Sequence, residues 1–270
     1  MQQIERITAV ADRYDAIVFD QFGVLHNGST PYPFAVQAIT NLQQLACKMA
    51  ELSNSGTSGA QTLERIASMG FPASAFGAVM TSGEALRLDV AQGKLRHLRR
   101  LFAITAAPGD AAAWAGDLPL SFTDDVAQAD AVLLMGLPDA DGHPAERAVL
   151  ETARAAGKLL ICSNPDRKAP RADGRLVESP GALAHEYADA GGDVHFYGKP
   201  HRPVFDALWA RLGDMDPKRI LMVGDSPEHD ITGAQTVGWD TLFINGGIHA
   251  GAAPDTLFAP DALPTYTMTT

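Results

Sequence analysis

Short apolar runs alternate with longer amphipathic stretches along almost the whole chain. Such alternation is typical of βαβ units, and repeated units predict an α/β fold with a largely parallel sheet. The predicted strands are Ala16–Phe19, Lys48–Leu52, Ala78–Thr81, Arg100–Thr105, Ala131–Met135, Lys158–Cys162, Val194–Tyr197, Arg219–Val223 and Thr241–Ile244. The predicted helices with the clearest apolar face are Pro33–Leu45, Thr62–Met69, Pro144–Ala156 and Pro203–Leu212.

The composition changes in the middle of the chain. From about Asp89 to Ala190 the sequence becomes rich in alanine, and its predicted strands do not end in acidic residues as the outer ones do. We interpret this segment as a second α/β unit inserted into the first. Residues 1–88 and 191–270 would then form a core domain, and residues 89–190 an inserted domain.

The overall charge excludes one broad class of partner. The 270 residues include 21 basic and 32 acidic ones, which gives a formal net charge of −11, whereas nucleic-acid binding needs a basic surface. No apolar segment approaches the ~20 residues that cross a bilayer, and residues 1–13 lack the pattern of a secretion signal. Cys47 and Cys162 fit no metal-ligand spacing and indicate a reducing compartment. We expect a cytoplasmic protein without nucleic-acid or membrane partners.

Two predicted strands end in acidic residues. Asp20 follows the strand Ala16–Phe19, and Asp225 follows the strand Arg219–Val223, with Asp230 close behind. Ligands of open α/β sheets bind at the carboxyl ends of the strands, and carboxylates beside a glycine-containing turn suit Mg²⁺. Two other interpretations stay open: Asp20 could begin an ordinary turn, and Asp230 could cap a helix.

Two further strand ends carry groups that suit an anion. The loop that contains Ser53, Asn54 and Ser55 is rich in glycine and small hydroxyl residues, so its N–H groups and hydroxyls can hold a phosphate. Lys199 stands between a glycine and a proline after Val194–Tyr197, and a rigidly held lysine can neutralise a phosphate or an attacking carboxylate. Taken singly, a connecting loop and a solvated lysine would explain these features as well.

This order of carboxylate, hydroxyl, lysine and acidic pair resembles the haloacid dehalogenase-like (HAD) superfamily. The resemblance implies that Asp20 is the nucleophile, that Ser53 binds the transferring phosphoryl group and that Lys199 stabilises the charges. It also implies a bound Mg²⁺. The implied metal ligands are Asp20, Asp225, Asp230 and the backbone carbonyl of Phe22.

The spacing of these residues is similar to that of class IIA of the superfamily, the NagD-like and p-nitrophenylphosphatase-like proteins. Few residues separate Asp20 from Ser53, whereas a whole domain fits between Ser53 and Lys199. The resemblance implies a Rossmann-like parallel-sheet core with an inserted α/β cap domain of the C2 type. It also implies that the segment with Asn164 and Asp166 helps to select the substrate, although these two residues could simply form a turn.

The implied substrate is a small phosphorylated metabolite such as a sugar or nucleotide phosphate. The sequence leaves open whether the cap also forms a homodimer. The expected substrate-binding residues are Asn54, Ser55, Asn164, Asp166 and His26.

Phe22 departs from the pattern of the phosphatases that the chain resembles. These carry a second aspartate two residues after the nucleophile, which protonates the leaving oxygen and later activates water. Phe22 can do neither, and loss of a general acid–base group typically costs ~10²–10⁴-fold in rate. His26 is a candidate source of the proton, although a polar loop residue is the simpler interpretation.

Three functions therefore stay open. The first is a Mg²⁺-dependent phosphatase that forms an aspartyl-phosphate on Asp20 and handles the proton differently. The second is a hydrolase of another bond, such as carbon–halogen, because some superfamily members of that kind also lack the second aspartate; the retained Asp225 and Asp230 argue against it. The third is a catalytically weak or inactive protein that binds a phosphorylated metabolite.

Overall fold

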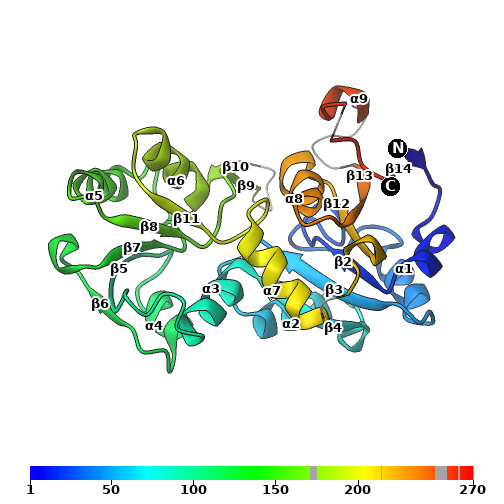
Figure 1. Ribbon diagram of the computed structural model, residues 1–270, viewed down its shortest axis with the longest axis horizontal. Helices are drawn as coiled ribbons and strands as arrows, with labels where there is room; N and C mark the ends of the chain where they lie inside the picture. Colours follow the sequence, from blue (N-terminus) through cyan, green and yellow to red (C-terminus); the bar gives the residue numbers. More distant parts are fainter. Residues whose placement is uncertain (171–174, 214, 247–253, 261, 270) are drawn as a thin grey trace. The chain divides into compact units, whose positions relative to one another are not determined.

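The chain consists of two compact units, each built on its own sheet (Figure 1). The computed structural model describes residues 1–170, 175–213, 215–246, 254–260 and 262–269. The core unit comprises Met1–Ser53, Gly59–Met80 and Lys199–Thr270. The inserted unit comprises Asn54–Ser58 and Thr81–Gly198.

A seven-stranded sheet in the order β1-β14-β13-β12-β2-β3-β4 forms the centre of the core unit. Its middle strands are apolar and largely buried, as expected for parallel strands that are covered on both faces. Val18 of β2 pairs in parallel with Ala50 of β3 on one side and Met222 of β12 on the other. The strands are β1 (Gln2–Gln3), β2 (Ala16–Phe19), β3 (Lys48–Ser53), β4 (Phe76–Thr81), β12 (Ile220–Gly224), β13 (Asp240–Asn245) and β14 (Tyr266–Thr269).

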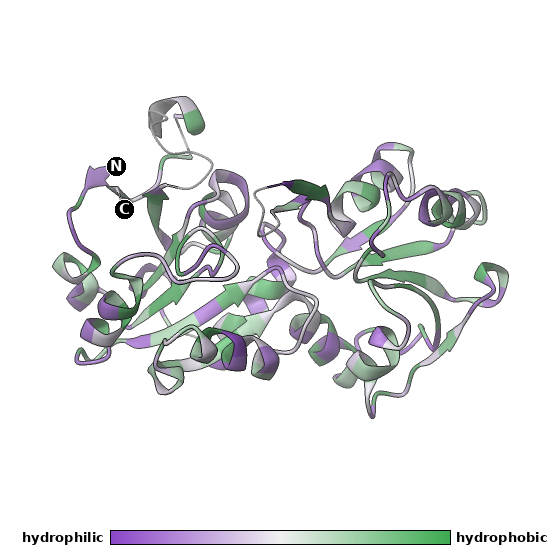
Figure 2. Ribbon diagram, turned by 180° about the vertical axis from the view of Figure 1, so that it is seen from behind, coloured by the Kyte–Doolittle hydropathy of each residue, from purple (hydrophilic) through white to green (hydrophobic). Residues whose placement is uncertain are grey.

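Helices pack on both faces of this sheet. Ile39 of α1 and Ile66 of α2 belong to one apolar cluster with Ile17 of β2. On the other face, Phe205 of α7 meets Trp239 edge-on, with 5.5 Å between the ring centroids. Figure 2 shows that hydrophobic residues predominate on the strands, whereas the helices also carry hydrophilic ones. The helices are α1 (Ala35–Leu42), α2 (Gly59–Ser68), α7 (Arg202–Leu212), α8 (Gly233–Thr236) and α9 (Pro254–Leu257).

The inserted unit contains a five-stranded parallel sheet in the order β11-β8-β7-β5-β6. Its helices α5 and α6 pack on the face that carries Val132 and Leu160. The strands are β5 (Arg100–Ile104), β6 (Ser121–Thr123), β7 (Ala131–Leu134), β8 (Leu159–Cys162) and β11 (Val194–Phe196), and a separate antiparallel pair is formed by β9 (Lys168–Pro170) and β10 (Leu176–Glu178). The helices are α3 (Ser82–Ala91), α4 (Asp110–Ala115), α5 (Pro144–Ala155) and α6 (Pro180–Asp189).

The α/β fold class is confirmed, and all of the predicted strands are present. The sequence did not predict β1, β6, β9, β10 or β14, because runs of two to four residues carry too little periodicity. Among the described residues, no helix has both the length and the apolarity that crossing a bilayer requires.

The boundaries between the two units lie at other residues than those predicted from the sequence. The expected junctions were 88/89 and 190/191, whereas the compact units divide at 80/81 and 198/199. Helix α3 belongs to the inserted unit because Trp114 Nε1 of α4 donates a hydrogen bond of 2.9 Å to Gly83 O. Strand β11 belongs there because His195 pairs with Ile161 of β8. Lys199 is therefore the first residue of the returning core segment.

One carboxyl group is buried within the central sheet. Glu51 of β3 is fully buried and pairs with Phe19 of β2. Its Oε2 accepts a hydrogen bond of 2.9 Å from Gln21 Nε2, whereas Oε1 has no hydrogen-bond partner among the described residues. Burial raises the pKa of Glu51 to about 8; the bond from Gln21 opposes this rise and the charge of Asp20 adds to it. We therefore expect Glu51 to be protonated at neutral pH.

Glu51→Gln should make the free energy of unfolding less dependent on pH. Below the ordinary glutamate pKa of 4.5, Glu51 is protonated in both the folded and the unfolded chain. As the pH rises from there to about 8, only the unfolded chain loses this proton, so the wild type loses stability relative to the variant by up to ~1.4 kcal/mol per pH unit. Urea unfolding of both proteins across this range measures the difference. A difference that does not change with pH would mean that Glu51 is ionised in the folded chain.

Candidate active site

Two neighbouring strands place carboxylates at the same edge of the core sheet. Asp20 directly follows β2, and its backbone N–H donates to Val223 O of β12 at 2.9 Å. Asp225 directly follows Gly224, the last residue of β12. Because β2 and β12 run parallel, their carboxyl ends meet at one edge, where open α/β sheets bind their ligands.

Lys199 joins two carboxylates of this edge. Its Nζ donates to Asp20 Oδ1 at 2.6 Å and to Asp230 Oδ1 at 2.7 Å. The Lys199 and Asp230 side chains are buried, whereas 15% of the Asp20 side chain is exposed. Burial acts to lower the pKa of Lys199, but the charges of Asp20 and Asp230 and their hydrogen bonds outweigh it, so the pKa is raised. Lys199 is therefore a permanent positive charge beside an accessible carboxylate.

Asp230 lies inside the π-helical turn Pro227–Thr232. Its Oδ2 accepts a hydrogen bond of 3.0 Å from Ser226 N, and Ser226 Oγ accepts one of 3.1 Å from His229 N. The interpretation of Asp230 as a helix N-cap is wrong, because Ser226 caps this turn. The Asp230 carboxylate is instead held between Lys199 and the N–H of Ser226.

Asp20, Asp225 and Asp230 form an acidic cluster. One carboxylate oxygen of each lies within 4.8 Å of the other two. Burial, together with the charges of Asp20 and Asp230, raises the pKa of Asp225 to about 8. Burial also raises the pKa of Asp20 to about 7, although the charge of Lys199 opposes this rise. Three carboxyl groups thus crowd around one ammonium, and a bound cation would stabilise their ionised forms.

The main chain approaches this cluster closely at two glycines. Gly23 has a φ of +86°, and a Cβ atom there would overlap Asp225 Oδ2. A Cβ atom at Gly224 would overlap the side chain of Asp230. The turn that contains the Phe22 carbonyl therefore lies against the Asp225 carboxylate. The donor set is made of oxygen atoms in a tight cradle, which fits a small hard cation such as Mg²⁺.

The turn after Asp20 is held together by Gln21. Its carbonyl oxygen accepts hydrogen bonds from the backbone N–H groups of Leu25, at 2.8 Å, and His26, at 3.1 Å. Its side chain donates to the buried Glu51. Gln21 thus connects the turn to strand β3 and fixes the chain that follows Asp20.

Phe22 and His26 lie beside each other in this turn. The Phe22 ring is 36% exposed and meets the His26 ring edge-on, with 6.3 Å between the centroids. The His26 side chain is buried, its Nδ1 accepts a hydrogen bond of 3.0 Å from Gly28 N, and its Nε2 has no partner among the described residues. Burial and the charge of Arg65 lower the pKa of His26 to about 4. His26 is therefore a buried, neutral residue and not a solvated loop residue.

The other residues that the sequence singled out lie in both units. Ser53 is the last residue of β3, at the sheet edge where β2 ends. Asn54 and Ser55 follow it and belong to the inserted unit, where Asn54 Nδ2 donates to Asp166 Oδ1 at 2.7 Å. Asn164 Oδ1 accepts a bond of 3.1 Å from Asp166 N, which makes the turn that the sequence left open. The residues brought together in the core unit are Asp20, Lys199, Asp225 and Asp230.

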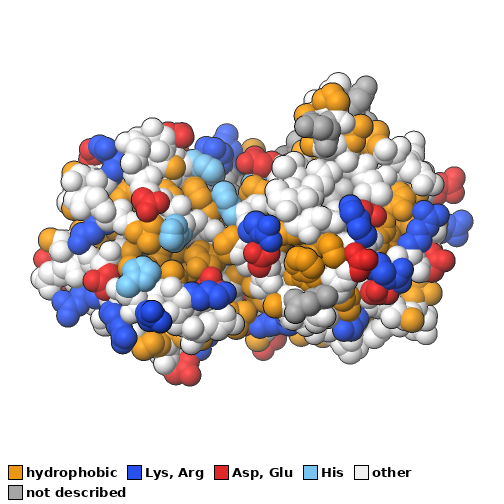
Figure 3. All heavy atoms as spheres, viewed as in Figure 1, with side chains coloured by type: hydrophobic (Ala, Val, Ile, Leu, Met, Phe, Trp, Pro, Cys, Tyr) orange, Lys and Arg blue, Asp and Glu red, His pale blue; other side chains and the backbone are white. Residues whose placement is uncertain are grey.

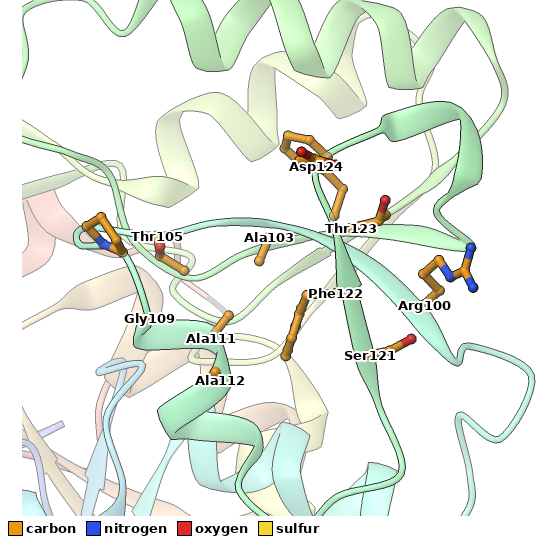
Figure 4. A pocket seen from close by; sticks show the side chains of 12 residues that line it. Arg100, Ala103, Thr105, Gly109, Ala111, Ala112, Ser121, Phe122, Thr123 and Asp124 are labelled. Atoms are coloured by element: carbon orange, nitrogen blue, oxygen red, sulfur yellow. The ribbon is translucent and has the colours of Figure 1, made fainter.

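The inserted unit carries an open groove of about 730 Å³. It lies between β5, β6 and α4, and Figure 4 shows the Phe122 ring facing the short side chains of Ala111 and Ala112 across it. None of the predicted site residues lines this groove. We therefore assign it no role in the chemistry of the acidic cluster.

One face of the molecule shows how the charged side chains are distributed. On the face that Figure 3 shows, Lys and Arg side chains lie among Asp and Glu side chains instead of forming one patch. With a formal net charge of −11, this face does not suit the phosphate backbone of a nucleic acid.

Sequence reasoning missed two residues close to the site. Glu51 supports the turn through Gln21, and its available signal was a lone charge inside the apolar run before Ser53. For Gly23, the sequence indicates only a glycine in the turn after Asp20. Its requirement for glycine comes from the position of Asp225, which is distant in sequence.

Comparisons with known proteins agree with this architecture. A sequence profile of the haloacid dehalogenase-like hydrolases matches residues 14–238. The chain is 27% identical over 267 residues to glycerol-3-phosphate phosphatase of Gallus gallus, which covers 90% of this chain and 83% of that protein.

Solved structures show the same similarity. A hydrolase of the haloacid dehalogenase-like family from Brucella suis matches with a TM-score of 0.83 and 31% identity over 98% of both chains. A glycerol phosphate phosphatase from Mycobacterium tuberculosis in complex with magnesium matches with a TM-score of 0.75 and 25% identity, over 96% of this chain and 76% of that one. The chain therefore belongs to the haloacid dehalogenase-like hydrolase family.

Proposed function

We propose that this protein is a Mg²⁺-dependent phosphatase that acts on a small phosphorylated metabolite through an aspartyl-phosphate on Asp20. The observation that carries the proposal is the pair of bonds from Lys199 to Asp20 and Asp230 beside a third carboxylate, Asp225. This arrangement offers a nucleophile, a fixed positive charge and an oxygen-rich cation site in one unit. The glycerol-3-phosphate phosphatase among its relatives and the magnesium complex of a similar structure support the reaction class and the cation.

Each of the site residues in the core unit has a separate task in this mechanism. Asp20 attacks phosphorus with one carboxylate oxygen, and the bond from phosphorus to the leaving oxygen breaks. Lys199 orients Asp20 and offsets charge on the phosphoryl oxygens, which the hydroxyl of Ser53 helps to position. Water then releases phosphate from Asp20. When bound, Mg²⁺ supplies further charge neutralisation, and the residues that would hold it are Asp20, Asp225, Asp230 and Phe22 through its backbone carbonyl.

Substrate selection is a separate task. Asn54, Ser55, Asn164 and Asp166 stay candidates for it, and the bond between Asn54 and Asp166 supports their acting together. His26 stays a candidate with less support, because its ring is buried.

Phe22 supports a second candidate function, in which the protein binds a phosphorylated metabolite and turns it over weakly. The side chain at this position has no acid–base group, which favours slow chemistry. A carbon–halogen hydrolase is less consistent with the site, because such a reaction gives Asp225 and Asp230 no cation to hold.

Asp20→Asn should lower phosphate release by more than ~10³-fold, because an amide cannot serve as the nucleophile. The measurement is inorganic phosphate released, with and without Mg²⁺, from acetyl phosphate, glycerol 3-phosphate, sugar phosphates, nucleotide phosphates and p-nitrophenyl phosphate. Asp15→Asn is the matched control, since Asp15 precedes the same strand at its other end and pairs with Arg219 on the surface. We expect this control to retain the activity of the wild type.

Other outcomes of that panel would contradict the proposal. Equal activity of the wild type and Asp20→Asn would exclude Asp20 as the nucleophile. If the wild type releases phosphate from none of the substrates but binds one of them in a Mg²⁺-dependent way, the result would favour the binding protein. Halide release without a metal would favour the carbon–halogen hydrolase.

Gly23→Ala should abolish Mg²⁺ binding, because the added methyl group displaces the Asp225 carboxylate. Gly70→Ala is the matched control, since Gly70 has a similar φ of +93° and nothing within 4 Å of an added Cβ. Both variants should lose about 1 kcal/mol of stability through backbone strain. Isothermal titration calorimetry with Mg²⁺ separates them: only Gly23→Ala should lose the binding heat. Equal Mg²⁺ affinity of the two variants would mean that the cation does not occupy this cradle.

A further inference from the structure

The residue two positions after the nucleophile presents a hydrocarbon surface. The Phe22 ring is 36% exposed and packs over Gly28, where an added Cβ would lie 3.2 Å from the ring. A phenyl ring has no proton to give to a departing oxygen. If a donor acts in the core unit, it must come from another side chain near Asp20.

His26 does not replace the missing donor. Its Nδ1 accepts a hydrogen bond from Gly28 N, so the imidazole is the neutral form with its proton on Nε2. Nε2 is buried and has no partner among the described residues, so this proton is enclosed by protein. The low pKa of His26, caused by burial and by Arg65, agrees with a ring that stays neutral.

Other titratable groups near Asp20 are held by contacts of their own. Glu51 is fully buried, and its Oε2 accepts the hydrogen bond from Gln21. Lys199 is bonded to two carboxylates, which hold its proton. Asp225 and Asp230 are the proposed ligands of the cation.

We propose that the substrate is an acyl phosphate, whose leaving group departs as a carboxylate and needs no proton. This inference rests on the proposed phosphatase function and narrows its substrate class. An alkyl phosphate is the opposite case, because an alkoxide is a strong base and must be protonated as it leaves. A positioned acid typically contributes ~10²–10⁴-fold to such a step. Among the described residues of the core unit, the two candidate positions for this acid, Phe22 and His26, do not supply it.

The chemistry balances without an added acid. An oxygen of Asp20 forms a bond to phosphorus while the anhydride bond to the substrate's acyl oxygen breaks, and that electron pair leaves on the carboxylate. The product on the enzyme is again an acyl phosphate, so the first transfer exchanges one carboxylate for another. Water then attacks phosphorus, the Asp20 carboxylate leaves, and the proton lost by the water remains on the released phosphate.

A series of leaving groups tests this inference. We would measure kcat/KM, which reports the first bond cleavage, for acetyl phosphate, nitrophenyl phosphate, phenyl phosphate and ethyl phosphate at constant Mg²⁺. The wild type should lose activity steadily along this series as the leaving group becomes more basic. In Phe22→Asp the ratio of ethyl phosphate to acetyl phosphate activity should rise by about 10²-fold, because the carboxyl group restores a donor. Phe22→Leu is the matched control: it removes the ring without adding an acid, so its ratio should stay that of the wild type.

The outcomes separate this inference from the proposed function. If the wild type cleaves ethyl phosphate as readily as acetyl phosphate, a donor acts on the leaving group, and the inference is overturned while the phosphatase function stands. If no compound of the series releases phosphate, the phosphatase function itself fails, and the inference with it. The wild-type series decides the matter alone if Phe22→Asp does not fold, which circular dichroism would reveal.

Discussion

One buried ammonium holds the site together. Lys199 begins the returning core segment, Asp20 follows β2, and Asp230 lies in the turn after β12, yet all three meet within hydrogen-bond distance. Carboxylates as close as those of the acidic cluster repel one another in a buried setting, and an unpaired buried charge is costly. The ion pair therefore supports both the fold at the carboxyl end of the sheet and the orientation of Asp20.

The sequence allowed the strands and the polar residues at their ends to be predicted, because both signals are local. An apolar run with a carboxylate behind it identifies Asp20 and Asp225 without knowledge of their neighbours. The burial of His26 and the role of Glu51 could not be predicted in this way, since both depend on what packs around them. The predicted domain boundaries differ from the observed ones for the same reason. Helix α3 and strand β11 belong to the inserted unit because of the residues that they contact, and a local sequence pattern does not reveal such contacts.

Position 22 separates two properties that the phosphatases of this class combine. Its carbonyl belongs to the main chain, and the glycine after it sets how closely that chain approaches Asp225. Its side chain is a ring at the surface. In the proposed mechanism, cation binding and proton transfer therefore depend on different atoms, so a change of side chain can alter one without the other.

The order of the segments also decides when the centre of the core sheet can form. Strand β2 pairs with β12, and Ala16 stands opposite Ile220, so this pairing has to wait until most of the chain has left the ribosome. The main segment of the inserted unit, Thr81–Gly198, is continuous and is complete earlier. Pairing between strands so distant in sequence is also slow. The acidic cluster thus exists only in a chain that has been made beyond residue 230, and a chain that stops after the inserted unit carries Asp20 without either of its acidic neighbours.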